Sequence, residues 1–313
     1  MCTNPRTRSA RGRGWTAALA TVAVLAAGVA AAAPAGGNID DRYRATSGPV
    51  STGAEAEEAL LTGHDDLILL RPTKLFTVHG AITGLSTTNA FLSPDATRRD
   101  ALGVAQLGLQ IGTRIASKVE VYADLSLVAA RYRRYGELDY SAVTAALGAR
   151  TTWHGVVLSA TYQPSVIFNR DFSVRQLTQH RVVISAAAAV RTRGFTIEPS
   201  VSIERVWADP SDFTNWAAGA QIAISHEVPG LPRVSVFAAG AYERRAYDAY
   251  FPGLLGVARQ DKRLQGALGV QWQATPRIAV VAQYSRQQNW STSDVNGYRA
   301  SSGSIGLSAR ARF

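Results

Sequence analysis

Cysteine is almost absent from this chain. The one cysteine, Cys2, lies in a basic N-terminal stretch that we expect to be removed. The remaining chain can therefore form neither disulfides nor thiolate metal sites. Because Cys2 precedes the apolar stretch of the leader, it cannot be the cleavage-site cysteine of a lipoprotein either.

Long apolar runs are also scarce. One apolar stretch, 15–32, is long enough to span a membrane as a helix; it follows four arginines and precedes Ala33-Pro34-Ala35. Beyond residue 35, no stretch approaches the roughly 18 apolar residues that a transmembrane helix needs. The order of arginines, apolar stretch and Ala33-Pro34-Ala35 predicts a secretory signal peptide over residues 1–35, and the alanine-rich, cleavable stretch makes a retained membrane anchor the weaker alternative. Because the leader holds four arginines and no acids, its removal lowers the net charge from +10 to +6, which suits anionic partners such as lipopolysaccharide or acidic sugars.

The chain from 73 to 313 alternates apolar and polar residues with a period of two. In the stretch 264–273, L-Q-G-A-L-G-V-Q-W-Q, the side chains of Leu268, Val270 and Trp272 share one face, and glutamines lie on the other. Segments of about ten such residues, bounded by turn residues, predict β-strands. A strand of a soluble sandwich has the same alternation, so one segment alone does not separate the two classes.

The connections between these segments alternate in length. Short connections lie at 115–118, 153–155, 191–194, 228–232 and 274–277. Longer polar connections lie between them, at 86–100, 131–139, 169–179, 208–214, 243–262 and 289–301. Short periplasmic turns and longer extracellular loops are typical of up-and-down outer-membrane barrels. The sequence therefore predicts an all-β, antiparallel transmembrane barrel of about twelve strands over residues 73–313.

Large aromatic residues gather near the two ends of the predicted strands. Those near the short connections are Phe76, Trp153, Phe195, Trp272 and Phe313, and those near the long connections are Phe168, Trp207, Trp216, Tyr242 and Tyr284. Amphipathic rings favour the headgroup level of a membrane, so a barrel carries one aromatic girdle at each boundary. A soluble sandwich would bury its aromatic residues at mid-strand instead.

The last predicted strand carries a resemblance to a known class of protein. Ile305, Leu307, Ala309 and Ala311 alternate with polar residues up to a terminal Phe313. This stretch resembles the C-terminal signal of Gram-negative outer-membrane β-barrels. The resemblance implies that the barrel-assembly machinery reads Phe313, Leu307 and Ile305, and that the protein resides in the outer membrane among lipid and lipopolysaccharide.

A second resemblance concerns the predicted first loop. The stretch 86–100, S-T-T-N-A-F-L-S-P-D-A-T-R-R-D, is similar to the first loop of barrels encoded with exopolysaccharide secretion systems. The resemblance implies polysaccharide-secretion components as partners. The same residue types also occur in ordinary turns, so both interpretations stay open.

Residues 36–72 lack the strand pattern. The stretch 53–64 predicts one short helix that ends at Gly63, and the rest is typical of a flexible linker. We expect a periplasmic segment that is either partly disordered or a partial plug of the lumen.

The polar face of the predicted strands defines the lumen. Its charged residues are Arg114, Glu120, Asp124, Arg150, Arg181, Glu198, Glu204, Arg310 and Arg312. Such charges can pair across a small barrel and fill it, or they can line a polar pore whose arginines favour anions. Many glycine, alanine and serine residues share this face, which favours some open space.

No motif indicates catalysis. The five histidines lack the G-x-S-x-G and H-E-x-x-H patterns, and the aspartates of 209–213 lack the spacing of a calcium loop. His180, near the outer girdle, is the best candidate for a catalytic base. We expect no enzyme activity, metal or cofactor, and the scattered basic residues indicate no nucleic-acid partner.

Together these patterns predict an outer-membrane pore for small or oligomeric solutes, with a preference for anionic ones. Association with exopolysaccharide export is the specific form of this hypothesis. The alternative is a non-conducting structural or surface-interaction barrel whose extracellular loops bind a partner. In that case Tyr247, Tyr250 and Phe251, within 243–262, would form an exposed binding patch.

Overall fold

The computed structural model describes residues 76–94, 97–116, 119–192, 194–250 and 258–313. The predicted signal peptide and N-terminal segment lie outside these residues. The described residues form one antiparallel sheet of thirteen strands. Their bounds are β1 Phe76–Thr87, β2 Asp100–Ala116, β3 Val119–Tyr132, β4 Tyr140–Trp153, β5 Val156–Asn169, β6 Arg175–Ala188, β7 Val190–Thr192, β8 Phe195–Asp209, β9 Asn215–Glu227, β10 Val234–Tyr250, β11 Ala258–Thr275, β12 Ile278–Ser291 and β13 Tyr298–Arg312.

The sheet closes on itself. Neighbours in the chain are neighbours in the sheet, and β1 pairs with β13 over eleven residue pairs. The short strand β7 continues β6, because Ala187 pairs with Ser200 and Val190 pairs with Ile197 in the same register on β8. The barrel therefore has twelve strands, as the sequence predicts. Closure satisfies the backbone groups that an open sheet edge would expose to lipid.

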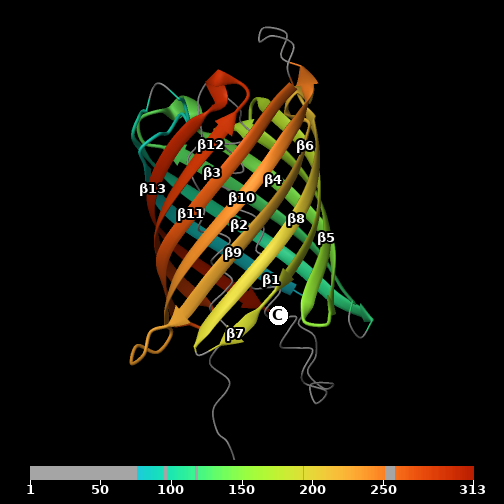
Figure 1. Ribbon diagram of the computed structural model, residues 1–313, viewed down its shortest axis with the longest axis vertical. Helices are drawn as coiled ribbons and strands as arrows, with labels where there is room; N and C mark the ends of the chain where they lie inside the picture. Colours follow the sequence, from blue (N-terminus) through green and yellow to red (C-terminus); the bar gives the residue numbers. More distant parts are fainter. Residues whose placement is uncertain (1–75, 95–96, 117–118, 193, 251–257) are drawn as a thin grey trace, which may run out of the picture.

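The two ends of the barrel differ in their connections. The short-turn end lies at the bottom of Figure 1, together with the C-terminus. Of the five connections at this end, four have two residues and the fifth has six. At the long-loop end the separations are five to twelve residues. Long loops face the cell exterior in barrels of this class, so the long-loop end is the extracellular one.

One predicted loop is mostly strand. The range 243–262 was expected to be a long extracellular connection, but β10 continues to Tyr250 and β11 begins at Ala258. Its polar residues alternate between the lumen, as Glu243 and Arg245 do, and the outer face beyond the apolar band, as Arg244 and Lys262 do. Polarity alone therefore led to a wrong boundary, because strand residues that are polar on both faces have the composition of a loop.

Large apolar side chains cover the outside of the barrel. Leu107, Ile82 and Leu268 are 59%, 66% and 62% exposed, although they lie within strands of a complete sheet. Their neighbours along each strand point inward and are buried or half-buried. This arrangement is inverted relative to a soluble protein, and lipid contact accounts for it.

Aromatic residues form a girdle at each edge of the apolar band. Phe195 and Trp207 are exposed at opposite ends of β8. They are twelve residues apart, which corresponds to roughly 30 Å along the barrel axis at about 3.3 Å per residue and a strand tilt of about 40°. This spacing matches the hydrocarbon thickness of a bilayer, about 30 Å.

Helical structure in the described residues consists of three single 3₁₀ turns in the long-loop connections. None of these is long and apolar enough to cross a membrane.

Candidate functional site: the barrel lumen

Large inward side chains lie along the barrel wall instead of projecting toward its axis. His79 of β1 extends over Gly108 of β2 and reaches Asp124 of β3, where Nε2 and Oδ2 are 2.8 Å apart. A Cβ atom at Gly108 would lie 2.3 Å from the imidazole Cε1. The missing side chain of Gly108 therefore provides the surface on which the ring lies.

The same arrangement recurs on two further strands. Tyr122 of β3 lies over Gly148 of β4, and its hydroxyl is 2.8 Å from Thr161 Oγ1 on β5. Phe237 of β10 lies over Gly269 of β11, where an added Cβ would come within 2.4 Å of the ring. In each case a small residue on the adjacent strand lets a large one lie flat.

Ion pairs between neighbouring strands hold several of the charges that line the lumen. Arg150 of β4 donates to Glu120 of β3 through Nε and Nη2, at 3.2 and 2.8 Å. Arg181 of β6 donates to Glu204 of β8 at 2.6 Å and to Gln163 of β5 at 3.3 Å. Each ion pair joins residues of neighbouring strands, so the opposite charges of a pair compensate each other.

A second set of charges lines the outer half of the lumen on β10 and β11. Glu243 accepts hydrogen bonds from Arg245 at 2.6 Å and from Arg263 at 3.2 Å. Arg259 donates to Asp261 at 3.0 Å. The sequence reading missed these residues because it assigned them to a loop. The sequence signal that could have identified them is the placement of Glu243, Arg245 and Tyr247, and of Arg259, Asp261 and Arg263, at every second position, as in a strand.

The expected binding patch of extracellular tyrosines is not present as predicted. Tyr247 points into the lumen, is 3% exposed and lies under the Arg259 guanidinium, whose Cζ is 4.3 Å from the ring centroid. Cation–π contact and burial explain this position. The side chains of Tyr250 and Phe251 lie outside the described part of the structure.

The nine predicted lumen residues all occupy inward positions of their strands. Arg114 lies opposite Glu120 on the adjacent strand, and Arg310 and Arg312 lie opposite His79 and Thr77. Glu198 is half-buried on the inward face of β8. The structure brings Glu120 with Arg150, and Arg181 with Glu204, into ion pairs. A role of these nine residues in solute passage stays a prediction.

The outer end of the lumen is narrowed on one side by an apolar cluster. It forms beneath the loop residues 88–94 and 133–139, and we call these loops and the cluster the outer cap. The buried members are Leu85, Ala90, Leu102, Val104, Val128, Ala130, Tyr132, Leu138, Tyr140, Ala142, Ile167 and Leu177. All of them come from β1 to β6 and their loops. A separate and smaller apolar cluster of Ala223, Phe237, Ala279 and Val281 lies on inward positions of β9, β10 and β12.

Hydrogen bonds to buried carboxylates fix the loops of the outer cap. Asp100, which is 6% exposed, accepts the backbone N–H groups of Ala101 at 2.8 Å and of Arg134 and Tyr135 at 3.2 Å. Phe91 packs edge-on against Tyr135, with ring centroids 4.6 Å apart. The first and second loops are therefore tied to each other.

The histidines have structural partners. His180 faces outward. Its ring stacks on the ring of Tyr162, and its Nδ1 lies 2.7 Å from the Tyr162 hydroxyl oxygen. His226 stacks on Phe195 and its Nδ1 lies 2.9 Å from the Gly194 carbonyl oxygen. In the described residues no three His, Cys, Asp or Glu side chains gather as metal ligands.

Comparison with known proteins supports the fold. None of the protein-family models searched matches the chain, and no curated protein matches it. Among solved structures, the barrel is similar to the COG4313 outer membrane channel from Pseudomonas putida F1, with a TM-score of 0.52 and 14% identity over 79% of this chain and 99% of that one. It is also similar to the β-domain of the Bordetella autotransporter BrkA (TM-score 0.44, 12% identity, 76% and 100% covered) and to LpxR from Salmonella typhimurium (TM-score 0.41, 11% identity, 73% and 99% covered). The closed sheet, the outward apolar band and the two aromatic girdles make this chain an outer-membrane β-barrel.

Proposed function

We propose that this barrel is a passive pore for small hydrophilic solutes with a mild preference for anions. The supporting observation is the solvent contact that inward titratable side chains retain. The side chains of His79, Glu120 and Arg181 are 30%, 29% and 22% exposed although they lie inside a closed barrel. A lumen filled by its own side chains would bury these groups.

The lining of the lumen suits polar solutes. Glutamine and serine side chains face the lumen along β12 and β13, including Gln283, Ser285 and Ser304. The outer cap places apolar groups on β1 to β6 at the extracellular end, so a hydrophilic solute would pass beside the glutamine and serine side chains of β12 and β13 there. Hydrogen-bonding groups on these strands would replace part of the solute's hydration.

The preference for anions rests on the inner mouth of the barrel. Arg150 and Arg181 form ion pairs with carboxylates. At the inward positions toward the short-turn end, Arg114, Arg150, Arg310 and Arg312 lie against Glu120 and Glu198, so arginines outnumber carboxylates there. Positive charge at a pore mouth raises the local concentration of anions.

Single-channel recordings in planar bilayers test the proposal. We expect steady conductance with a reversal potential, under a KCl gradient, that indicates anion preference. The variant R114Q/R310Q/R312Q should move that potential toward the cation side. The control E120Q/R150Q removes an ion pair without changing the net charge and should leave the potential unchanged. Absence of conductance from the wild-type barrel would instead support the non-conducting interaction protein.

Association with exopolysaccharide export is the finer form of this proposal. It rests on the resemblance of the stretch 86–100 to the first loop of such barrels. Within that stretch the Asn89 side chain donates to the carbonyl oxygens of Ser93 and Arg299, at 2.9 and 3.1 Å. These bonds explain the asparagine structurally, so the test must be biological. Deleting the gene should lower secreted polymer, and unchanged secretion would remove the finer proposal.

A further inference from the structure

We propose that the outer face of β10 to β13 carries a binding site for lipopolysaccharide, which takes its lipid A phosphates on four cations and an acyl chain in an adjoining groove. The cations are Arg244, Lys262, Arg286 and Arg299, one on each strand, and all four are exposed. This proposal concerns the lipid-facing surface and does not depend on the pore function.

The cations form one patch. Arg244 lies directly opposite Lys262 on the neighbouring strand. Arg299 lies opposite Gln288, which is two residues from Arg286 on the same face of β12. Side chains directly opposite each other are about 5 Å apart at Cβ and diagonal neighbours about 7–8 Å apart. Between the two pairs, Lys262 lies opposite Trp290, four residues along β12 from Arg286, which corresponds to about 13 Å at about 3.3 Å per residue. The pair Arg244 with Lys262 and the pair Arg286 with Arg299 can therefore each meet one of the two phosphates of a single headgroup.

Positive charge in this patch is not neutralised by the protein. Arg244 donates to the neutral amide oxygen of Gln260 at 3.2 Å. The Gln288 side-chain oxygen, in the orientation that satisfies its neighbours, accepts from Arg299 at 3.1 Å. Within the described residues, no carboxylate forms an ion pair with any of the four cations. Like charges placed opposite each other destabilise a sheet, so a bound anion would relieve the pairing of Arg244 with Lys262.

The nearest outward carboxylate is already engaged. Asp248 of β10 accepts a hydrogen bond from Arg205 at 2.8 Å, and the Arg205 guanidinium also lies over the rings of Trp207 and Trp216, at 5.5 and 5.2 Å. Asp248 and Arg205 thus compensate each other beside the patch. The four remaining cations are left for a ligand of opposite charge.

The patch lies at the depth of the lipid headgroups. Arg244 and Arg286 are the next outward residues after Tyr242 and Tyr284, the outer girdle tyrosines on β10 and β12. Their side chains therefore begin where the apolar band ends, on the extracellular side. In a Gram-negative outer membrane the lipid of this leaflet carries phosphate groups on a glucosamine disaccharide with several acyl chains. Arginine and lysine bind phosphate through charge-assisted hydrogen bonds.

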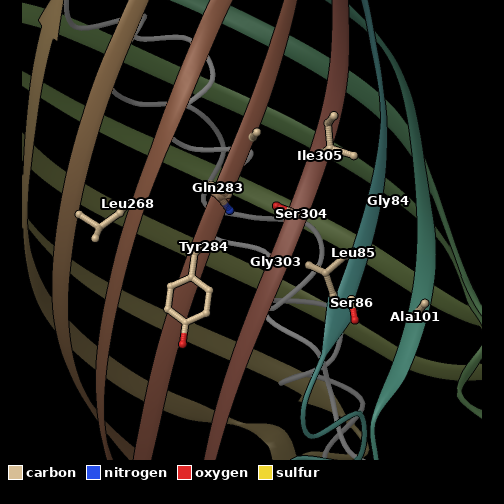
Figure 2. Close-up of a pocket in the computed structure, with 11 residues that line it drawn as sticks. Gly84, Leu85, Ser86, Ala101, Leu268, Gln283, Tyr284, Gly303, Ser304 and Ile305 are labelled. Atoms are coloured by element: carbon tan, nitrogen blue, oxygen red, sulfur yellow. The ribbon is translucent and has the colours of Figure 1, made fainter.

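An open apolar groove adjoins the patch on its membrane side. It has a volume of about 700 Å³ and runs across β11, β12, β13, β1 and the edge of β2. Figure 2 shows it from outside, with Leu268, Tyr284 and Ile305 around the floor left by Gly84 and Gly303. The glycines leave a depression that the neighbouring apolar side chains surround. An acyl chain fits such a depression, and a phosphate of the headgroup that carries this chain would then reach Arg286.

Native mass spectrometry of the detergent-solubilised full-length barrel, titrated with purified bisphosphorylated lipid A, tests the site. We expect wild-type barrel to retain lipid A and K262Q/R286Q to bind it roughly tenfold more weakly, as expected from the loss of charge-assisted contacts. The matched control R233Q/R277Q removes two arginines at the short-turn end and should bind as wild type does. Equal affinity of K262Q/R286Q and wild type, or an equal loss in the control, would overturn the proposal.

Two further measurements test the groove and the choice of lipid separately. The variant G84L/G303L fills the groove without changing any charge, and an added Cβ meets no atom within 4 Å at either glycine. It should also weaken lipid A binding, and binding at wild-type strength would show that the groove takes no acyl chain. Phosphatidylglycerol should bind less tightly than lipid A. Equal binding would show a general anionic-lipid surface and contradict the assignment to lipopolysaccharide.

Discussion

His79 and Asp124 are joined by a 2.8 Å contact although a whole strand separates them. His79 belongs to β1 and Asp124 to β3, and the residue between them on β2 is Gly108. The contact exists because Gly108 has no side chain. One glycine thus allows a hydrogen bond between side chains of two strands that are not neighbours.

Replacing Gly108 by alanine should move the imidazole off the wall. The new Cβ would occupy the position of the His79 ring, so the ring would turn toward the barrel axis and lose Asp124. We expect lower single-channel conductance and a loss of about 1 kcal/mol in the free energy of unfolding, the typical net value of one such hydrogen bond. Gly103→Ala is the control, because its Cβ meets nothing within 4 Å. Equal conductance of the two variants would contradict the geometry.

Removing Arg181 should destabilise the barrel more than removing its whole ion pair. Glu204 is 5% exposed, so Arg181→Gln leaves a buried carboxylate without its cation. Breaking such a pair costs about 3 kcal/mol or more. The double variant R181Q/E204Q should recover most of this loss in urea unfolding followed by tryptophan fluorescence. A double variant as unstable as the single one would show that the arginine acts through other contacts.

A charge on the outer face should cost far more than the same charge on the inner face. Leu107 is exposed midway along β2, and its neighbour Gln106 points into the lumen. Leu107→Arg should lower the free energy of unfolding in lipid bilayers by about 2–4 kcal/mol, while Gln106→Arg should change it little. Comparable costs at the two positions would mean that the apolar face does not contact lipid.

The terminal aromatic residue should matter for assembly more than for stability. Phe313 is 69% exposed and contributes little packing to the folded barrel. From the resemblance of the last strand to the assembly signal, Phe313→Ser should lower the amount of barrel in the outer membrane of cells, measured by its heat-modifiable band. Refolding into detergent should remain close to that of wild type. Trp272→Ser, at the same girdle, is the control, and an equal assembly defect there would exclude a specific signal.

Loosening the outer cap should change the behaviour of open pores. Asp100→Ala removes the acceptor of three backbone N–H groups, which should cost about 2 kcal/mol and free the second loop. We expect noisier current with more frequent transitions in single-channel records. Asp212→Ala, at an exposed position of another long-loop connection, should leave the records unchanged. If both variants behave like wild type, the outer cap does not influence the passage of ions.

The sequence by itself determined the class of fold. Each crossing of the bilayer by a strand leaves a local pattern in the sequence. The pattern consists of a period of two within the strand, an aromatic residue near each end, and a short or a long connection to the next strand. The class of fold can therefore be recognised along the chain without knowing which strands pair. The same alternation placed residues such as Arg114 and Glu198 on the inward face. It did not place the ends of β10 and β11, because these strand ends are polar on both faces beyond the apolar band and so have the same composition as a loop.

Only the tertiary structure decided which inward residues meet. The partner of Arg150 is Glu120 and that of His79 is Asp124, and neither pair follows from distance along the chain. Strand register sets these neighbours, and alternation is unchanged when a strand slips by two residues. For the same reason, only the register of β10 to β13 brings four cations on four strands into one patch.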